Sequence, residues 1–308
     1  MKRFTTLAAS AVIVPALGLA AAPAASAAPK PAPAPKNPVE ALAKALAKGT
    51  TLTRNANATM DFGDGVKLTV SESGVLKLNS KGVFAADTTS KAAASRADKG
   101  TEVLPLLGAS RTILLNGTAY LQSPIFKDRL PAGKTWLKVT GKDLHGTQIS
   151  GGSAFGLVDV FEPGVAKYLV TKSAVKPGGA VDGVKKTTLY SGSATVAELA
   201  KVSKTLRDAL GRDAKGKEAK QTIVKWGLWA DANQLPVRLT TSMGLKGDKA
   251  PLIKGIEQFK KWGAPVSIVA PPAELVATLD ELRDGKDEES QESFGNPRFL
   301  PKLFIDKK

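Results

Sequence analysis

The segment Arg111–Ser123, RTILLNGTAYLQS, contains two strand-like runs on either side of Asn116-Gly117. Asn-Gly between apolar runs predicts a β-hairpin, because both residues tolerate the positive φ angles of a type I′ turn. The same pattern occurs upstream, where Ala58–Phe62 and Val66–Ser71 flank the turn residues Gly63-Asp64-Gly65. These two hairpins predict a chain organised around an antiparallel sheet.

Further runs with alternating apolar and polar residues predict additional strands. A turn at Ser73-Gly74 precedes the first of them, and Asp231–Gln234 is predicted to turn between two of the later ones. Pro236 indicates a sheet edge or a bulge near the start of its strand, because proline has no N–H to donate. The additional predicted strands are Val75–Asn79, Gly82–Thr88, Lys134–Thr140, Gln221–Ala230, Leu235–Met243 and Val266–Ala270.

Helical patterns interrupt these strands. A first helix is predicted after the N-cap Asn37, with Pro38 in its first turn and Gly49 at its end. Thr195 and Glu198 have the spacing of a capping box. Because strands do not alternate regularly with helices, the fold class is predicted to be α+β rather than doubly wound or a (β/α)-barrel. The other predicted helices are Ser153–Val160, Gly164–Val170, Thr195–Gly211 and Glu274–Leu282.

The composition excludes several chemistries. The 308 residues include no Cys, which rules out disulfides, thiolate metal sites and thiol nucleophiles. His145 is the single histidine, so any Ser-His-Asp triad would have to use it. The formal net charge is +16, from 44 Lys and Arg against 28 Asp and Glu, and it favours an anionic partner.

The N-terminus is predicted to be a secretory signal peptide, residues 1–27. Lys2 and Arg3 precede an apolar stretch, and Ala25-Ser26-Ala27 provides a cleavage site. A membrane anchor is the weaker alternative, because the stretch is short and rich in Ala. Cleavage removes two cations and leaves a charge of +14. The mature chain is then predicted to be secreted, without a transmembrane segment or a lipid anchor.

Three further parts follow the signal in the predicted domain organisation. Residues 28–37 form a Pro/Ala-rich tether, residues 38–283 a single domain, and residues 284–308 a charged and flexible tail.

No catalytic motif is complete. Gly211–Lys217, GRDAKGK, fits the start of a phosphate-binding loop, but Glu218 stands where Ser or Thr is required. Phe155 breaks the G-x-S-x-G pattern around Ser153, and His145 is predicted to lie in an exposed loop. We therefore expect no enzyme activity, no cofactor and no metal.

Two other functional classes find little support in the sequence. A pair of acidic residues could serve a glycosidase, and Asp159 with Glu162 or Asp61 with Asp64 are the candidates. Aromatic sugar platforms are scarce, however, since the chain has four Trp and three Tyr. The basic residues are spread along the chain without interleaved aromatics, so we expect no nucleic-acid partner.

Four further motifs occur in order along the chain. They are Tyr120-Leu121 with Leu130-Pro131-x-Gly133-Lys134-x-Trp136-Leu137-Lys138-Val139, Val181-Asp182-Gly183-Val184 with Thr188–Gly192, Trp229–Ala232 with Leu235–Arg238, and Gly263–Val266 with Ala270-Pro271-Pro272. Together they resemble a family of actinobacterial envelope proteins, the mycobacterial LppX/LprG lipoproteins, which are related in fold to the LolA and LolB carriers. The resemblance covers Val39–Leu282, and this chain departs from the family in lacking the lipidated cysteine.

The resemblance implies a strongly curved antiparallel half-barrel sheet with helices packed in its concave face. An apolar cavity between sheet and helices would hold acyl chains, so the protein would be a secreted carrier that binds lipids or lipoproteins without bond chemistry. Alternation along the strands and the stripe of one helix then provide candidate lining residues. They are Leu68, Val70, Ile113, Leu115, Leu137, Val139, Leu199, Leu206, Leu210, Val224, Trp226 and Leu228.

Taken singly, each of these residues fits an ordinary core better than a cavity lining, which leaves a second hypothesis open. The protein would then be a structural or interaction protein of the cell envelope. It would bind anionic wall components through its positive charge, and its own side chains would fill the space between sheet and helices.

Overall fold

The computed structural model describes residues 36–63, 65–95, 108–126, 129–140, 158–248 and 250–284. All of them belong to one compact unit, Pro35–Lys308. Several predicted features lie outside the described residues, namely the signal peptide, most of the tether, Asp64, His145, Ser153 and residues 285–308 of the C-terminal tail.

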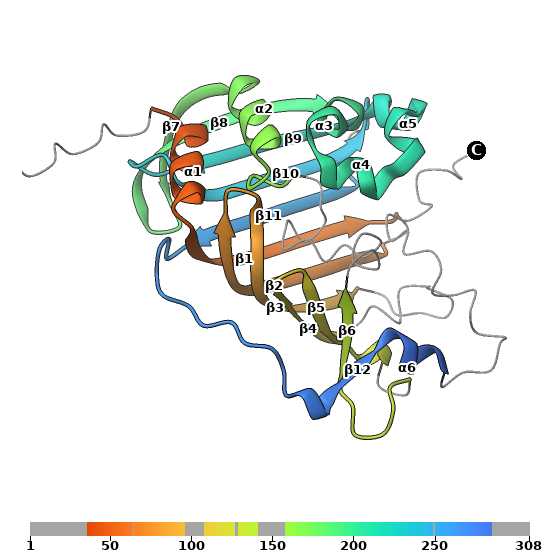
Figure 1. The fold of residues 1–308 in the computed structure, drawn as a ribbon. Coiled ribbons are helices and arrows are strands. Elements are labelled where there is room, and N and C mark those ends of the chain that lie inside the picture. The colour runs from red at the N-terminus through yellow and green to blue at the C-terminus, as the bar shows by residue number, and fades with distance from the viewer. Residues whose placement is uncertain are drawn as a thin grey trace, which may run out of the picture. The chain divides into compact units, whose positions relative to one another are not determined.

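Twelve described strands form a single sheet (Figure 1) in the order β12-β6-β5-β4-β3-β2-β1-β11-β10-β9-β8-β7. All pairs are antiparallel except β12 with β6. The predicted antiparallel meander is therefore confirmed. The strands are β1 (Thr50–Asp61), β2 (Lys67–Asn79), β3 (Gly82–Ala94), β4 (Gly108–Leu115), β5 (Thr118–Gln122), β6 (Trp136–Thr140), β7 (Ala174–Val181), β8 (Val184–Thr195), β9 (Thr222–Ala230), β10 (Pro236–Leu245), β11 (Ile253–Lys260) and β12 (Val276–Thr278).

Two meanders make up this sheet. One runs from β1 to β6 and the other from β7 to β11, and the pairing of β1 with β11 joins them. Short turns set the neighbour order within each meander. Asn116 (φ 50°) and Gly117 (φ 73°) connect β4 to β5, as the sequence predicts. Asp182 (φ 50°) and Gly183 (φ 85°) make the same kind of turn between β7 and β8.

The predicted turn at Ser73-Gly74 is wrong, because β2 runs through it without interruption. Gly74 instead allows close approach of the neighbouring strand. A Cβ placed there would lie 2.2 Å from the Asp87 carbonyl oxygen and 2.7 Å from the Cα of Thr88. The glycine therefore marks strand packing, not a chain reversal.

The second meander was only partly predicted. Strands β7, β8 and β11 were not predicted as strands, while Val266–Ala270, predicted as one, lies in an irregular segment. Pro236 does sit at a bulge, where the register with β9 shifts. The edge alternative is wrong, because β10 lies between β9 and β11.

The helices are short and differ in part from the prediction. The helix after Asn37 and the one over Gly164–Val170 are confirmed, whereas Thr195–Gly211 divides at Ser203 and Glu274–Leu282 becomes three short elements. Of Ser153–Val160, residues 158–160 are not helical and the rest lies outside the described residues. The elements are α1 (Pro38–Ala47), η2 (Pro124–Phe126), α2 (Pro163–Thr171), α3 (Val196–Val202), α4 (Lys204–Leu210), η4 (Gly211–Lys215), α5 (Lys217–Gln221), η5 (Ala273–Leu275) and α6 (Leu279–Asp284).

Local hydrogen bonds explain the helix boundaries. The Asn37 side chain accepts hydrogen bonds from the backbone N–H groups of Val39 and Glu40 and caps α1. Thr195 and Glu198 form the predicted capping box of α3. Ser203 then caps a new helix by accepting from the Leu206 N–H, and this ends α3 and starts α4.

The two faces of the sheet differ in what covers them. Helices α1 to α5 lie over one face, here called the helix face (Figure 1), where the largest buried cluster includes Leu52, Leu76, Trp226 and Leu239. The opposite face is called the open face. Ile268 and neighbouring residues pack on it over β3, β4 and β6. The strong curvature and the concave placement of the helices stay predictions.

We expect Gly74→Ala to destabilise the protein, because the added methyl group would collide with the backbone of β3. Overpacking of this kind costs about 1–3 kcal/mol of unfolding free energy. Urea unfolding followed by circular dichroism measures the change. The matched control is Ser73→Ala, at an exposed position of the same strand, which should stay within about 0.5 kcal/mol of the wild type. Equal stability of both variants would contradict the close approach at Gly74.

Candidate functional site

An apolar pocket of about 180 Å³ lies where α1 and α2 meet the turn between β2 and β3. Helix α1 contributes Val39, Leu42, Ala43 and Leu46, which recur at the spacing of one helix face. The hydroxyl of Ser80 is the polar side-chain group of the lining. The remaining wall residues are Val160, Phe161, Pro163 and Ala166.

The walls of the pocket combine buried and exposed residues. Leu42, Leu46, Phe161 and Ala166 are buried, whereas Ala43 is exposed. The pocket therefore reaches from the core of the helix face to the surface beside Ala43. Pockets that enclose a small-molecule ligand measure roughly 300–1,000 Å³. This pocket is smaller and fits the end of an apolar chain rather than a whole lipid.

Aromatic contacts fix the inner wall. The Phe161 ring packs edge-on against Phe259, with centroids 5.4 Å apart, and against Trp262 at 6.2 Å. The indole N–H of Trp262 donates to the Pro236 carbonyl oxygen at 2.9 Å. Phe161 is therefore held by side chains that are themselves anchored to the sheet.

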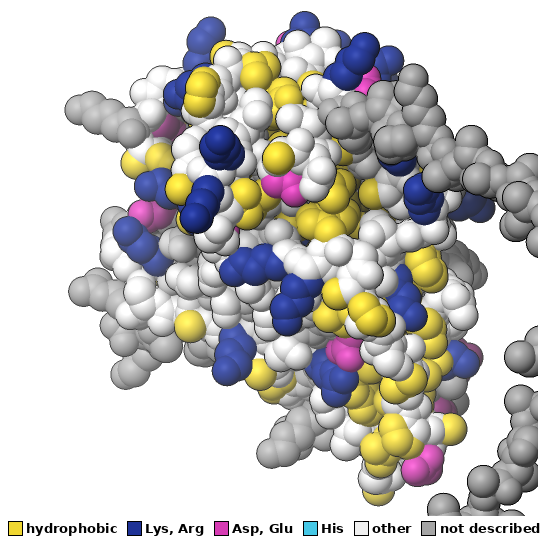
Figure 2. Space-filling view, turned by 90° about the vertical axis from the view of Figure 1, so that its left-hand side faces the viewer, with side chains coloured by type: hydrophobic (Ala, Val, Ile, Leu, Met, Phe, Trp, Pro, Cys, Tyr) yellow, Lys and Arg dark blue, Asp and Glu magenta, His cyan; other side chains and the backbone are white. Residues whose placement is uncertain are grey.

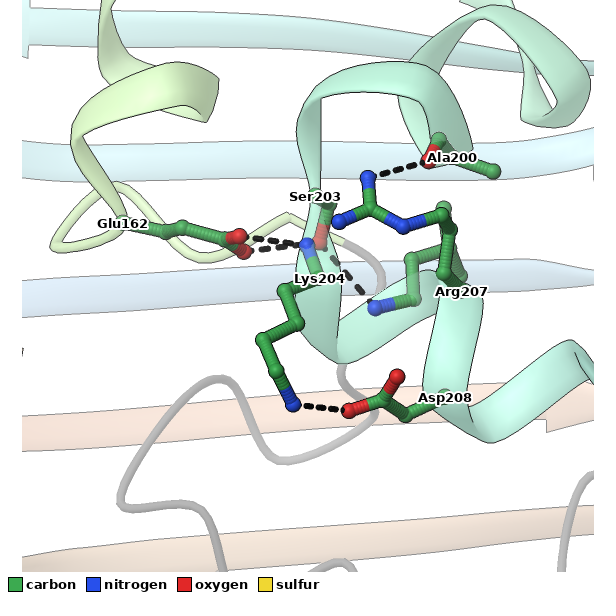
Figure 3. Close-up of polar contacts among 7 residues, drawn as sticks. Glu162, Ala200, Ser203, Lys204, Arg207 and Asp208 are labelled. Carbon is green, nitrogen blue, oxygen red and sulfur yellow. Dashed lines mark hydrogen bonds and ion pairs between the residues drawn. The ribbon is translucent and has the colours of Figure 1, made fainter.

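Two acidic side chains make hydrogen bonds that position the segment carrying this wall. Asp159 Oδ1 accepts a hydrogen bond from the Phe161 N–H at 2.8 Å. Glu162 accepts one from the Ser203 hydroxyl at 2.8 Å and another from the Lys204 N–H (Figure 3). Glu162 thus joins the start of α2 to the break between α3 and α4. Both residues of the first predicted acidic pair have these hydrogen-bonding roles in the fold.

A buried ionic cluster lies on the same face of the sheet. Arg54 on β1 pairs with Glu72 on β2, and its Nη1 is 3.9 Å from Oε2 of Glu257 on β11. The Arg54 side chain is only 2% exposed. Burial alone would lower the pKa of its guanidinium, but the attraction of Glu72 and Glu257 outweighs burial and raises that pKa. Arg54 therefore stays charged inside the fold.

The sequence-predicted lining residues fall into separate groups, and none of them lines the pocket. Leu137 and Val139 pack with Phe126 and Leu282 near α6. Leu68 is buried and Val70 half-buried, opposite Met60 and Ala58 of β1. The large cluster under the helices contains or contacts Leu199, Leu206, Leu210, Val224, Trp226 and Leu228. As lining of a lipid cavity, all of these residues stay a prediction.

Ile113 and Leu115 are separated from the rest by the pleat of the sheet. Leu114 pairs with Ala86 and Ala119 and belongs to the cluster under the helices. Because side chains alternate along a strand, its neighbours Ile113 and Leu115 lie on the open face, in the cluster with Trp136 and Ile268. Alternation along a strand shows which residues share a face of the sheet. It does not show whether that face is the helix face or the open face.

The residues of the pocket were missed by the sequence reasoning. The amphipathic pattern of α1 was recognised, but it carries no sign of which side chains leave space beside them. Their partner, the segment from Val160 to Pro163, is more than a hundred residues away in the chain. Only the packing of α1 against α2 brings the two together.

Among the described residues, no group of three or more His, Asp or Glu side chains could hold a metal ion. None of the described helices has the length and apolar character needed to cross a membrane.

Comparisons with known proteins find distant structural similarity only. No protein-family model and no curated protein sequence matches the chain. A LolA superfamily protein from Nitrosomonas europaea aligns at 6% identity and a TM-score of 0.24, over 77% of this chain and 96% of that chain. A DUF1329 family protein from Desulfovibrio piger aligns at 8% identity and a TM-score of 0.22, over 76% and 95%.

A third solved structure, a beta-barrel-like protein of the domain of unknown function DUF1849 from Brucella abortus, aligns at 10% identity. Its TM-score is 0.22, over 71% of this chain and 98% of that chain. At these TM-scores we draw no inference from the likeness.

We expect Glu162→Gln to destabilise the protein, because the neutral amide makes weaker hydrogen bonds to Ser203 and Lys204 than the carboxylate does. The expected loss of unfolding free energy is about 1–2 kcal/mol. Urea unfolding at neutral pH measures it. Glu274→Gln, at an exposed position, is the control and should be neutral. Equal unfolding free energies of the two variants would show that Glu162 does not stabilise the start of α4.

Asp159 should make stability depend on pH. Burial raises the pKa of its carboxyl above the usual range, although the Phe161 N–H and Arg54 favour the charged form. Its contribution is therefore complete below the unfolded-state pKa and is lost as the pH rises through the higher folded-state pKa. Asp159→Asn keeps an oxygen acceptor for Phe161 but cannot ionise. We expect the variant to gain stability relative to the wild type as the pH rises above about 4, the ordinary pKa of an unfolded Asp.

Urea unfolding of both proteins across this pH range measures the effect. Asp213→Asn, at an exposed position, is the control and should follow the wild type throughout. An Asp159→Asn variant that is less stable than the wild type at neutral pH would show that the carboxylate is charged and stabilises the fold through Arg54.

Proposed function

We propose that this protein binds the apolar chain of a lipid in the pocket between α1 and α2 and acts as a carrier without bond chemistry. The observation that carries the proposal is the pocket itself, which is lined by apolar side chains and one hydroxyl. A soluble fold normally fills such space with its own side chains. A space that reaches the surface beside an exposed alanine provides an entrance for a ligand chain.

The surroundings of the pocket support this function. Its inner wall is preformed, because Phe161 is locked by Phe259 and Trp262. Its outer rim is small, since Ala43 contributes only a methyl group. A chain end can therefore enter without displacing a bulky side chain, while the rest of the ligand stays outside. Figure 2 shows one side of the molecule, where hydrophobic side chains gather among Lys and Arg side chains.

The motif resemblance supports a carrier of the LppX/LprG type, and two of its motifs meet in space. Asp182 accepts a hydrogen bond from Arg238 Nε at 2.8 Å. These residues come from the motifs Val181–Val184 and Leu235–Arg238, which the resemblance selected independently. We propose further that residues 1–27 are removed on secretion and that the carrier works in a cell envelope without a lipid anchor.

Ala43→Trp tests the pocket, because a large ring on the rim would fill the entrance without disturbing the core. We expect uptake of a fluorescent fatty-acid analogue by the purified mature protein to fall at least tenfold. Titration followed by probe fluorescence measures the affinity. Native mass spectrometry of the secreted wild type should also detect co-purified acyl lipids.

Ala47→Trp is the matched control. It makes the same change at another exposed position of α1 that does not line the pocket, and it should bind the probe like the wild type. Wild-type protein that takes up no probe would overturn the proposed function. Equal binding by both variants would place any lipid site elsewhere.

A further inference from the structure

The open face of the sheet carries polar side chains over β9–β11 and β1–β3. Register partners on neighbouring strands lie on the same face. One such row passes from Ser242 to Lys254, Thr59 and Thr69. The adjacent row contains Thr240, Ile256, Asn57, Ser71 and Lys91.

Lysine side chains dominate the charge of this face. Lys91, Lys225, Lys254 and Lys260 are all exposed there. The two glutamates of the same strands, Glu72 and Glu257, belong to the opposite face, where they pair with Arg54. Among the charged residues of these strands, the pleat therefore places the lysines on the open face and the two glutamates on the helix face.

The aspartates that the described strands β1 and β3 place on the open face already have basic partners. Asp61 pairs with Lys67 at 3.3 Å and Asp87 with Arg111 at 2.7 Å. Asp182 at the β7–β8 turn pairs with Arg238.

The four exposed lysines have no ion pair with a described carboxylate. Asp61 also attracts Lys254, but Asp61 is already paired with Lys67, and the charge of the lysines is therefore available to an external anion.

Two of these lysines flank a hydroxyl. Ser242 on β10 is the register partner of Lys225 on β9 and of Lys254 on β11. The two lysine backbones are thus two strand spacings apart, roughly 10 Å. Two ammonium groups and a hydroxyl at this spacing match the needs of a phosphate group, which accepts hydrogen bonds and carries negative charge.

An apolar residue interrupts the basic surface. Ile256 is 45% exposed and lies two residues from Lys254 on the same face. An isolated apolar side chain among lysines has no partner in a soluble polyanion. At a bilayer surface, however, it can enter the boundary between headgroups and acyl chains while the lysines contact phosphates.

We propose that the open face, centred on Lys225, Ser242, Lys254 and Ile256, docks on a bilayer that contains anionic phospholipids. This inference deepens the proposed function and rests on it, because docking would bring the carrier to its source of lipid. Charge complementarity and the exposed Ile256 select the bilayer as the occupant of this face.

Sedimentation with vesicles tests the proposal. The mature protein should bind vesicles of phosphatidylcholine that contain about 30% phosphatidylglycerol. It should not bind vesicles of phosphatidylcholine alone. Each lysine near an anionic surface contributes roughly fivefold to affinity, so Lys225→Gln/Lys254→Gln should weaken binding about 25-fold. Raising the salt concentration should weaken vesicle binding by the wild type and reduce the difference in affinity between the wild type and the double variant.

The control is Lys201→Gln/Lys220→Gln, which makes the same charge change at exposed positions of the helix layer. It should lower binding less than threefold. Equal losses in both double variants would attribute binding to net charge and overturn the proposal. Equal binding to neutral and anionic vesicles would also overturn it. Retention on immobilised polyphosphate without vesicle binding would overturn it too, because that retention would assign the open face to a soluble polyanion.

Fatty-acid probe uptake, measured without vesicles, separates this proposal from the proposed function. The Lys225→Gln/Lys254→Gln variant should take up the probe like the wild type, and its circular dichroism spectrum should be unchanged. Vesicle binding without probe uptake would overturn the carrier function and leave the docking face standing. Probe uptake without vesicle binding would do the reverse.

Discussion

Arg54 stands at the junction on which the whole sheet depends. It lies on β1, the strand that pairs with β2 of one meander and with β11 of the other. Its guanidinium pairs with Glu72 and Glu257 from these two neighbours. Buried ion pairs add little net stability, because desolvation offsets the attraction. A slip in register would nevertheless leave a buried charge without its partner. We infer that this cluster specifies how the two meanders join.

The same register divides the molecule into two surfaces with different tasks. The helix face is apolar and must be covered, and α1 to α5 cover it. The coverage leaves a space between α1 and α2, and the rim residue Ala43 is too small to fill it. The open face instead keeps lysines and hydroxyls in solvent. The proposed ligand site and the proposed docking surface thus lie on opposite sides of one sheet, and neither constrains the residues of the other.

Local signals predicted the parts of the fold that depend on neighbours in sequence. The Asn116-Gly117 hairpin, the Asn37 cap and the Thr195–Glu198 capping box were all predicted correctly. Strand β11, IKGIEQFK, was missed because its glycine and charged residues obscure the alternation; pairing with strands on both sides holds it extended. The pocket could not be predicted, because it results from contact between distant segments.

The two outermost strands have a consequence for self-association. An open sheet exposes backbone N–H and C=O groups at both edges, which can template pairing with another chain. At one edge β12 is only three residues long. At the other, β7 contains Pro177, which lacks an N–H, and its register with β8 shifts twice. Lys176 adds a charge beside the proline. Both edges are therefore poor templates, and the sheet can remain unclosed without recruiting further copies.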